Sequence, residues 1–274
     1  MSTPDAATSS PVGGSRPLVI AHRGSSYAVA EHTQGAYRRA LDEGVDGLEC
    51  DVRLTADGEL VCLHDRTLER TGGGDGIVST MTLAELRAVD WGAWKHHAAG
   101  ERTTGDGTLI TLRELVELAL GAARPTGLAI ETKHPTRFGG AVEREVATLL
   151  SDYDLTGPRT SGMPWVRMMS FSPLAVRRMT SLLPELPTVL LLGAPMPLPY
   201  RGGALLAGAA TAGLDVAILR DHPEVVAAQH DKGHEVFVWT VDDPVDIELC
   251  LRLRVDAIIS NRPELVLDLS GRSG

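Results

Sequence analysis

Short apolar runs alternate with amphipathic segments along almost the whole chain. The apolar runs have strand length, and the segments after them repeat apolar residues at helical spacing. Strands are expected at 18–24, 47–54, 127–131, 166–170, 188–192, 216–219, 235–239 and 257–260. Helices are expected at 33–43, 112–123, 142–151, 173–183, 204–212, 223–232 and 244–253. Because such alternation is typical of a closed barrel rather than an open doubly wound sheet, the pattern predicts an α/β fold, the TIM (β/α)8 barrel.

The second predicted strand continues into a hairpin. Asp57-Gly58 favours a two-residue type I′ turn, since both residues tolerate a positive φ. Counting back from this turn along both arms places His64 opposite Asp51, on the same face. A polar insertion follows at about 66–110, with a short helix predicted at 83–89. We expect this loop or small subdomain to lie over the barrel mouth.

A single barrel domain is expected at 17–270, since 274 residues suit one barrel of about 250 residues. Residues 1–16 are rich in Ser, Thr, Pro, Gly and Ala, which predicts a disordered N-terminal tail. This tail lacks the apolar core of a signal peptide, and no run reaches the roughly 18 apolar residues of a spanning helix. Three widely spaced cysteines fit reduced thiols better than disulfides. These features predict a cytoplasmic protein without stable membrane insertion.

The net charge of −10 excludes partners that require a basic surface. Nucleic acids and anionic membranes are therefore not expected to bind. A small anionic substrate needs only local positive charge, which a metal ion, Arg23 and Lys133 would supply. The sequence indicates no oligomeric state.

Three carboxylates are expected at one end of the barrel. Glu49 and Asp51 share a face of the second strand, because side chains alternate along a strand. Glu131 ends the third strand, and the carboxyl ends of parallel strands meet at one rim. Such oxygen ligands suit Mg²⁺ or Ca²⁺, with Mn²⁺ as a further candidate. Without a cysteine or histidine cluster, structural zinc is not expected.

Two histidines are expected near these carboxylates. His22 and Arg23 lie where the first strand ends, and functional groups gather at such ends in parallel α/β sheets. His64 ends the second arm of the hairpin. An imidazole with an ordinary pKa of about 6.5 suits acid and base catalysis near neutral pH.

Several short motifs follow one another in order between about residues 18 and 263. They are His22-Arg23-Gly24, Glu31-His32-Thr33, Glu49-Cys50-Asp51-Val52, Asp57-Gly58, His64-Asp65, Thr67-Leu68, Ile130-Glu131-Thr132-Lys133, Ser170-Phe171, Trp239-Thr240-Val241 and Asp256-Ala257-Ile258-Ile259-Ser260-Asn261-Arg262-Pro263. In this order they resemble the glycerophosphodiester phosphodiesterase family. The resemblance implies a TIM barrel that hydrolyses glycerophosphodiesters with a divalent metal ion.

A few positions depart from that family's pattern. Ala30-Glu31-His32-Thr33 stands where the family usually reads Pro-Glu-Asn-Thr. Asp242 stands where the family usually has Asn, and Asn261 stands where it often has Asp. Because no expected metal ligand or paired histidine is replaced, these departures concern substrate preference more than reaction type.

The resemblance and the chemistry of the side chains together imply how a phosphodiester would be held. Glu49, Asp51 and Glu131 would hold the metal ion, which would polarise a phosphoryl oxygen. Arg23 and Lys133 would offset the negative charge that grows on the phosphate oxygens.

His22 and His64 would form the acid and base pair. One would take a proton from the attacking oxygen, a water or the adjacent glycerol hydroxyl, and the other would protonate the leaving alkoxide. The sequence does not order the two roles. Trp239 would pack against the glycerol, with a structural role in the core equally open.

The implied reaction converts diesters such as glycerophosphocholine and glycerophosphoethanolamine to sn-glycerol 3-phosphate and an alcohol. Two alternatives stay open. A lyase that cleaves lysophospholipids would leave a cyclic phosphate and would need an apolar groove for the acyl chain. A catalytically silent barrel would only bind a metal ion or a phosphometabolite, and the presence of both histidines disfavours it.

Overall fold

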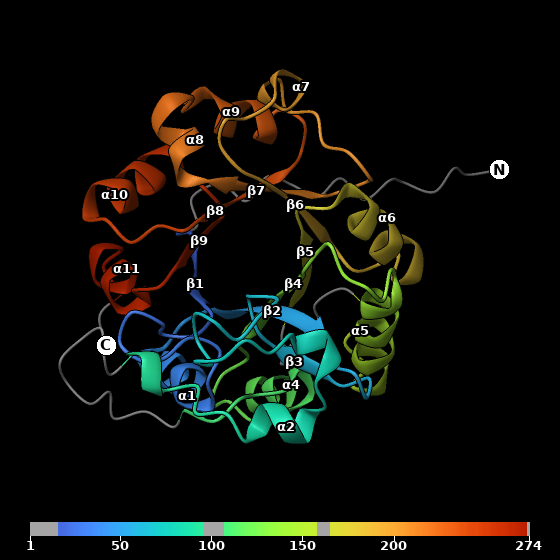
Figure 1. Cartoon of the computed structure of the whole chain (residues 1–274). Helices are drawn as coiled ribbons and strands as arrows, with labels where there is room; N and C mark the ends of the chain where they lie inside the picture. Colours follow the sequence, from blue (N-terminus) through green and yellow to red (C-terminus); the bar gives the residue numbers. More distant parts are fainter. Residues whose placement is uncertain (1–15, 96–106, 158–164, 273–274) are drawn as a thin grey trace.

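The computed structural model describes residues 16–95, 107–157 and 165–272. Within these ranges, eight parallel strands form a closed barrel, because β1 pairs with both β9 and β2 (Figure 1). The strands are β1 (Leu18–His22), β2 (Gly47–Leu54), β4 (Gly127–Thr132), β5 (Val166–Ser170), β6 (Thr188–Leu192), β7 (Thr211–Asp215), β8 (Glu235–Trp239) and β9 (Ala257–Ser260). The predicted TIM barrel is confirmed. Residues 1–15 of the predicted tail and 96–106 of the insertion lie outside the described residues.

Helices surround the barrel. They are α1 (Gln34–Glu43), α4 (Leu112–Leu120), α5 (Ala141–Asp152), α6 (Pro173–Leu182), α7 (Leu198–Arg201), α8 (Val216–Asp221), α9 (Glu224–His230), α10 (Pro244–Leu253) and α11 (Pro263–Leu269). At the start of α1 the Thr33 hydroxyl accepts a hydrogen bond from the Ala36 N–H at 3.2 Å. The helix ends at Gly44, whose φ of 83° suits a left-handed cap. Across the described ranges, no helix combines the length and the apolar character that crossing a bilayer requires.

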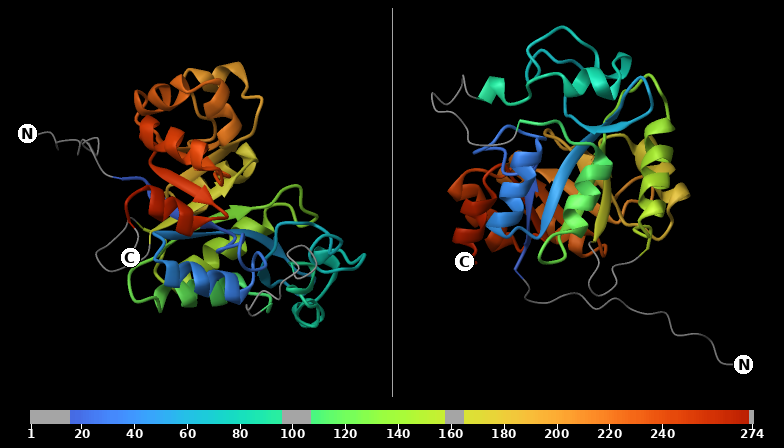
Figure 2. Two further views of the ribbon diagram at one scale, coloured as in Figure 1. Left: turned by 90° about the vertical axis from the view of Figure 1, so that its left-hand side faces the viewer. Right: turned by 90° about the horizontal axis from the view of Figure 1, so that it is seen from below.

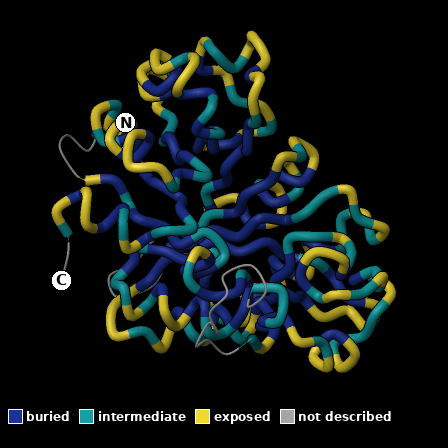
Figure 3. The backbone as a smooth tube through the Cα atoms, turned by 60° about the vertical axis from the view of Figure 1, so that its left-hand side comes forward, coloured by how far each residue is buried: buried dark blue, intermediate teal, exposed yellow. Residues whose placement is uncertain are grey.

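Apolar side chains fill both sides of the barrel wall. One cluster lies inside the barrel and includes Ile20, Trp165, Val189, Phe237 and Ile259. A larger cluster packs the outer strand faces against the helices. In Figure 3 the central strands are accordingly buried, while the exposed residues lie on the outer turns and helices. Because the barrel interior is a packed core, the open place for a ligand is the rim.

The predicted helix at 204–212 and the predicted strand at 216–219 are wrong. The strand β7 instead occupies Thr211–Asp215, and α8 begins at Val216. Small residues read as helical in sequence, but here they allow close packing: a Cβ on Gly213 would lie 2.6 Å from a methyl group of Leu191 on β6. The Asp215 carboxylate accepts a hydrogen bond from the Ala217 N–H at 2.9 Å, which starts α8 at this point.

The predicted register of the hairpin is also wrong, by one residue. β3 (Leu60–Cys62) pairs antiparallel with β2 through Leu54 and Leu60, and the Leu63 N–H donates to the Asp51 carbonyl at 2.9 Å. The connecting loop is longer than a two-residue turn, with Gly58 at φ 88°. Because a one-residue shift exchanges the two faces of a strand, Leu63 rather than His64 lies opposite Asp51.

The insertion after this hairpin has a small core of its own. It includes the helical turn η1 (Val78–Thr80) and the helix α2 (Leu83–Arg87). Its buried apolar side chains pack with Val61 of β3 and with Leu63, and they are Leu68, Val78, Leu86, Trp91 and Leu109. In the right-hand view of Figure 2 the insertion lies beyond the end of the barrel toward which β2 points. Its described part therefore stands beside the rim, and the expectation that the insertion lies over the barrel mouth stays a prediction, since residues 96–106 lie outside the described residues.

Candidate active site

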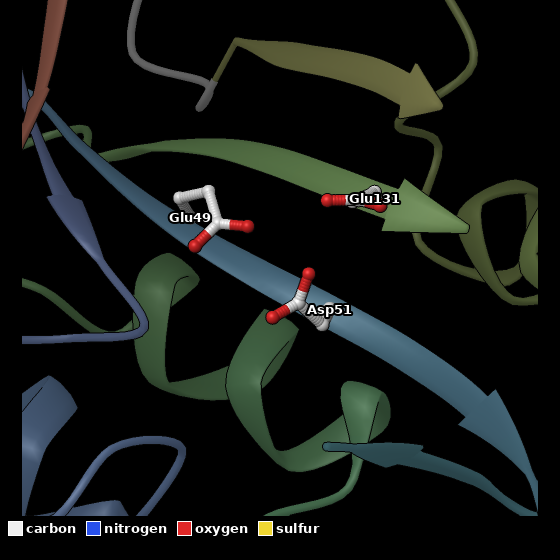
Figure 4. Close-up of side chains that lie close together, drawn as sticks. All are labelled: Glu49, Asp51 and Glu131. Carbon is white, nitrogen blue, oxygen red and sulfur yellow. The ribbon is translucent and has the colours of Figure 1, made fainter. Parts of the chain in front are cut away.

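The three predicted carboxylates come together on two neighbouring strands. Asp51 on β2 is paired in register with Glu131 on β4, and Glu49 lies two residues before Asp51. One carboxylate oxygen from each residue lies within 4.8 Å of the others. In Figure 4 the three side chains rise from the same side of the two strands. All three are buried.

Two basic side chains contact these carboxylates. The Lys133 Nζ lies 2.9 Å from Glu131 Oε1 and 3.0 Å from Asp51 Oδ1. The Arg23 side-chain Nε lies 3.0 Å from Asp51 Oδ2, and the Arg23 backbone N–H donates to Glu49 Oε2 at 2.9 Å. Two cations thus face three carboxylates in a buried space, which leaves negative charge in excess.

This excess negative charge shifts the pKa values of the carboxyl groups. Burial and the nearby Asp51 raise the pKa of Glu131 to about 8. The same two causes raise the pKa of Glu49 well above its ordinary value. Burial also acts to raise the pKa of Asp51, but a hydrogen bond from His32 and the charges of Arg23 and Lys133 outweigh it and keep this pKa well below the ordinary value. A further positive charge would stabilise all three groups as carboxylates.

The donor set fits a divalent cation. It consists of carboxylate oxygens, which are the ligands that Mg²⁺ and Ca²⁺ prefer. Asp51 Oδ1 is buried and accepts no well-directed hydrogen bond, although Lys133 Nζ lies nearby. A buried acceptor that lacks a well-directed hydrogen bond is costly, and a bound cation would add to the compensation that Lys133 already gives.

The turn after β1 brings His22 and Arg23 to this site. Gly24 has a φ of 83°, and a Cβ there would lie 2.7 Å from the Ala36 backbone. Only glycine therefore allows the chain to turn so closely against α1. The His22 Nε2 then lies 4.0 Å from Glu49 Oε2.

His64 reaches the site from the bend that follows β3. Its Nδ1 lies 2.8 Å from Asp65 Oδ1, so the N–H at this position donates to the carboxylate and Nε2 stays free. Arg70 of the insertion bonds Asp65 and also binds Glu31, 2.6 Å away. The imidazole of His64 is thereby held through side chains rather than through the strand pairing that the sequence suggested.

One cavity collects most of the predicted residues. It is lined by His22, Arg23, Glu49, His64, Glu131, Lys133, Met169, Phe171, Leu191, Trp239, Thr240 and Ile259. Asp51 lies behind it, in contact with Arg23 and Lys133. Trp239 packs edge-to-face on Phe171, with ring centroids 5.3 Å apart, and the two rings form an apolar part of the lining next to Lys133, whose Nζ lies 6.0 Å from the centroid of the Phe171 ring. The cavity thus offers a polar side for a phosphate and an apolar side for carbon.

A model of the glycerophosphoryl diester phosphodiesterase family matches residues 22–265. The chain belongs to this family. It is therefore a phosphoric diester hydrolase of the glycerophosphodiester phosphodiesterase class.

Relatives of this phosphodiesterase match it over nearly their whole length. The "Probable glycerophosphodiester phosphodiesterase 1" of Mycobacterium tuberculosis is 44% identical over 247 residues, which cover 90% of each chain. The glycerophosphodiester phosphodiesterase of Caldanaerobacter subterraneus is 32% identical over 257 residues, 94% of this chain and 99% of the relative. A phosphodiesterase of Oleispira antarctica, solved with the product sn-glycerol-3-phosphate, has a TM-score of 0.74 at 26% identity, and the match covers 92% of this chain and 96% of that one.

His32 has a part in the site of this phosphodiesterase that was not evident from the sequence. His32 is buried, its Nε2 donates to Asp51 Oδ2 at 2.9 Å, and its Nδ1 lies 2.8 Å from the Tyr37 hydroxyl. Burial lowers the pKa of His32, which favours the neutral ring. His32 therefore orients Asp51 without adding positive charge. The one signal in the sequence was a histidine at a position where the family usually has Asn.

A chain of hydrogen bonds behind His22 was likewise not evident from the sequence. The Asn261 Nδ2 donates to Asp242 Oδ2 at 2.6 Å, so the Asn261 Oδ1 points to His22. There it accepts from His22 Nδ1 at 2.7 Å and from the Ser26 hydroxyl at 2.7 Å. This arrangement places the proton of a neutral His22 on Nδ1 and leaves Nε2 unprotonated.

Proposed function

We propose that this phosphodiesterase hydrolyses glycerophosphodiesters, such as glycerophosphocholine and glycerophosphoethanolamine, to sn-glycerol 3-phosphate and an alcohol, with a bound divalent cation. One observation carries the proposal: three buried carboxylates, two basic side chains and two histidines meet around a single cavity. The apolar wall of Trp239 and Phe171 suits the carbons of a glycerol.

Glu49, Asp51 and Glu131 would hold the cation, with Mg²⁺, Ca²⁺ or Mn²⁺ as candidates. A cation held there would supply Lewis-acid stabilisation of a phosphoryl oxygen, a contribution of several kcal/mol. Arg23 and Lys133 line the same cavity and offset the charge that develops on the other phosphate oxygens.

We assign proton abstraction to His22. Its Nε2 carries a lone pair because Nδ1–H donates to Asn261, and burial, followed by the charge of Arg23, lowers the pKa of His22 to about 3, which favours the neutral base. This nitrogen takes the proton from the attacking water or glycerol hydroxyl.

We assign proton donation to His64. Its side chain is 34% exposed, so it lies nearer the solvent than His22 does. Burial lowers the pKa of His64 and the Asp65 carboxylate bonded to Nδ1 opposes this shift, so a proton held on Nε2 is readily given to the leaving alkoxide.

Removal of the cation is expected to stop the reaction. Loss of the phosphodiester and release of glycerol 3-phosphate from glycerophosphocholine are measured by ³¹P NMR, first with EDTA and then after addition of Mg²⁺, Ca²⁺ or Mn²⁺ in turn. We expect no turnover in EDTA and recovery with at least one ion. Turnover that EDTA leaves unchanged would contradict the role of the carboxylates. A cyclic phosphate product would indicate the lyase, and absence of turnover with every ion would indicate the silent barrel.

We expect that exchanging Asp242 and Asn261 for one another largely preserves activity, whereas changing either residue alone lowers it. Asn261→Asp alone places two carboxylates in contact, where Asn261 Nδ2 now donates to Asp242 at 2.6 Å. Asp242→Asn alone places an amide N–H₂ group against the Asn261 backbone and side-chain N–H groups, which now donate to the Asp242 carboxylate. Each single change should lower kcat/KM about tenfold, the worth of a hydrogen bond to a charged group. In the double variant an amide at position 242 donates to a carboxylate at position 261, so kcat/KM should return to near the wild-type value. Additive losses in the double variant would show that the two residues do not act together on His22.

A further inference from the structure

A second cavity, of about 200 Å³, lies next to the catalytic one. It opens between the β2–β3 hairpin with η1 on one side and the loop from β4 to α5 on the other. These segments lie side by side at the rim in the right-hand view of Figure 2. Nothing in the reaction described above uses this cavity.

The polar lining of this cavity is cationic. The side chains of Arg53, Arg66, Lys133 and Arg137 line it, with the hydroxyls of Ser79 and Thr136, and no Asp or Glu is among its lining residues. This concentration of positive charge stands in a chain whose net charge is −10. Such a lining attracts a compact anion and gives it several donors.

Among the described residues, the arginines of this cavity form no ion pair with a carboxylate. Within the described ranges, neither Arg66 nor Arg137 forms an ion pair with a carboxylate. Arg53 uses Nε and Nη2 on the His64 carbonyl, at 3.0 and 2.6 Å, which leaves Nη1 with no hydrogen bond to a described residue.

Lys133 connects the two cavities, since it lines both. Its Nζ contacts Glu131 and Asp51 in the catalytic cavity. Arg53 makes a second connection, because it holds the backbone of His64. An anion in the second cavity would therefore lie close enough to belong to the same substrate molecule as the reacting phosphodiester.

We propose that the second cavity is a subsite for a phosphate group carried by the alcohol moiety of the substrate. This inference rests on the proposed function, and it adds to it a preference, among glycerophosphodiesters, for substrates whose alcohol bears a further phosphate. Arginine suits this task because its planar guanidinium binds phosphate oxygens with two parallel N–H groups. The exposed Arg66 and Arg137 would provide most of this recognition without touching the reacting atoms.

The test compares two substrates that differ only in this phosphate: a diester of glycerol 3-phosphate with glycerol, and the same diester with glycerol phosphate as the alcohol. Loss of the phosphodiester is followed by ³¹P NMR with the cation supplied. In the wild type, kcat/KM should be at least about tenfold higher for the phosphorylated substrate. The double variant Arg66→Glu, Arg137→Glu should remove this advantage and change kcat/KM for the neutral alcohol by less than about twofold.

The neutral-alcohol substrate also reports whether the double variant is folded. A matched control, Arg177→Glu with Arg252→Glu, makes the same change of charge at exposed positions of α6 and α10 and should preserve the preference. Equal kcat/KM for both substrates in the wild type would overturn the subsite alone. No turnover of either would overturn the proposed function and the subsite with it. Inorganic phosphate gives a further outcome. If it alters turnover of the neutral substrate only when both arginines are present, and the phosphorylated substrate has no advantage, the cavity binds a free anion. The assignment of the cavity to the substrate would then be wrong.

Discussion

Replacement of His22 by alanine is expected to lower kcat by about 10²- to 10⁴-fold, the usual contribution of a general base. The His22 Nε2 is unprotonated in the neutral ring, and His64, the other histidine that lines the cavity, is assigned proton donation instead. The three carboxylates are unchanged, so cation binding should persist. Rates measured under saturating substrate, together with a calorimetric titration of the cation, separate the two properties.

A surface histidine provides the matched control for this variant. His222 is partly exposed and pairs only with Glu224, at 3.3 Å, among the described residues. His222→Ala should change kcat by less than about twofold, as surface substitutions usually do. If His22→Ala turned over at the wild-type rate, the assignment of proton abstraction to His22 would be wrong.

Asp51→Asn is expected to lower kcat/KM by about 10³-fold, because it removes a Lewis-acid contribution of several kcal/mol at about 1.4 kcal/mol per tenfold. Asp51 accepts from His32 and contacts both Arg23 and Lys133, so a neutral amide leaves two buried cations with less compensating charge. The amide has nearly the same size as the carboxylate, and the packing around it should be kept. Calorimetry should show that cation affinity is lost together with activity.

The control for this variant is Asp231→Asn, at an exposed position after α9. It removes the same charge from the whole protein but should leave cation affinity and kcat/KM within about twofold of the wild type. Asp51→Asn that bound the cation as tightly as the wild type would refute the assignment of Asp51 as a ligand.

The strands and helices of the barrel could be predicted from sequence where the local pattern of apolar residues and helix-starting residues agreed with the tertiary packing. The strand Glu235–Trp239 and the helix Pro244–Leu253 were predicted with their exact bounds, because an apolar run and a Pro-started helix each have clear limits. The region around Gly213 could not be predicted in this way, since its small residues fit a strand only through contact with Leu191. Contacts between distant segments of the chain are not encoded in local periodicity.

The site was predictable to the extent that it depends on strand ends. Glu49, Asp51 and Glu131 follow from side-chain alternation and from the parallel order of the strands, and the structure brings them together. Their roles as ligands stay predictions. The contact of His32 with Asp51 depends on how the turn after β1 folds back, and that fold was not readable from spacing. The position of His64 was also not readable from spacing. The predicted hairpin register was wrong, although it placed His64 near the same carboxylates.

The most direct test of the central claim is a crystal soaked with Mn²⁺ and measured for anomalous scattering. We predict one strong peak between the carboxylates of Glu49, Asp51 and Glu131, at about 2.0 to 2.6 Å from an oxygen of each, as for hard divalent ions. Lys133 should then move away from Asp51 Oδ1, which it now approaches to 3.0 Å. A fully soaked crystal with no peak at these oxygens, and with Lys133 still in contact with Asp51, would contradict the account.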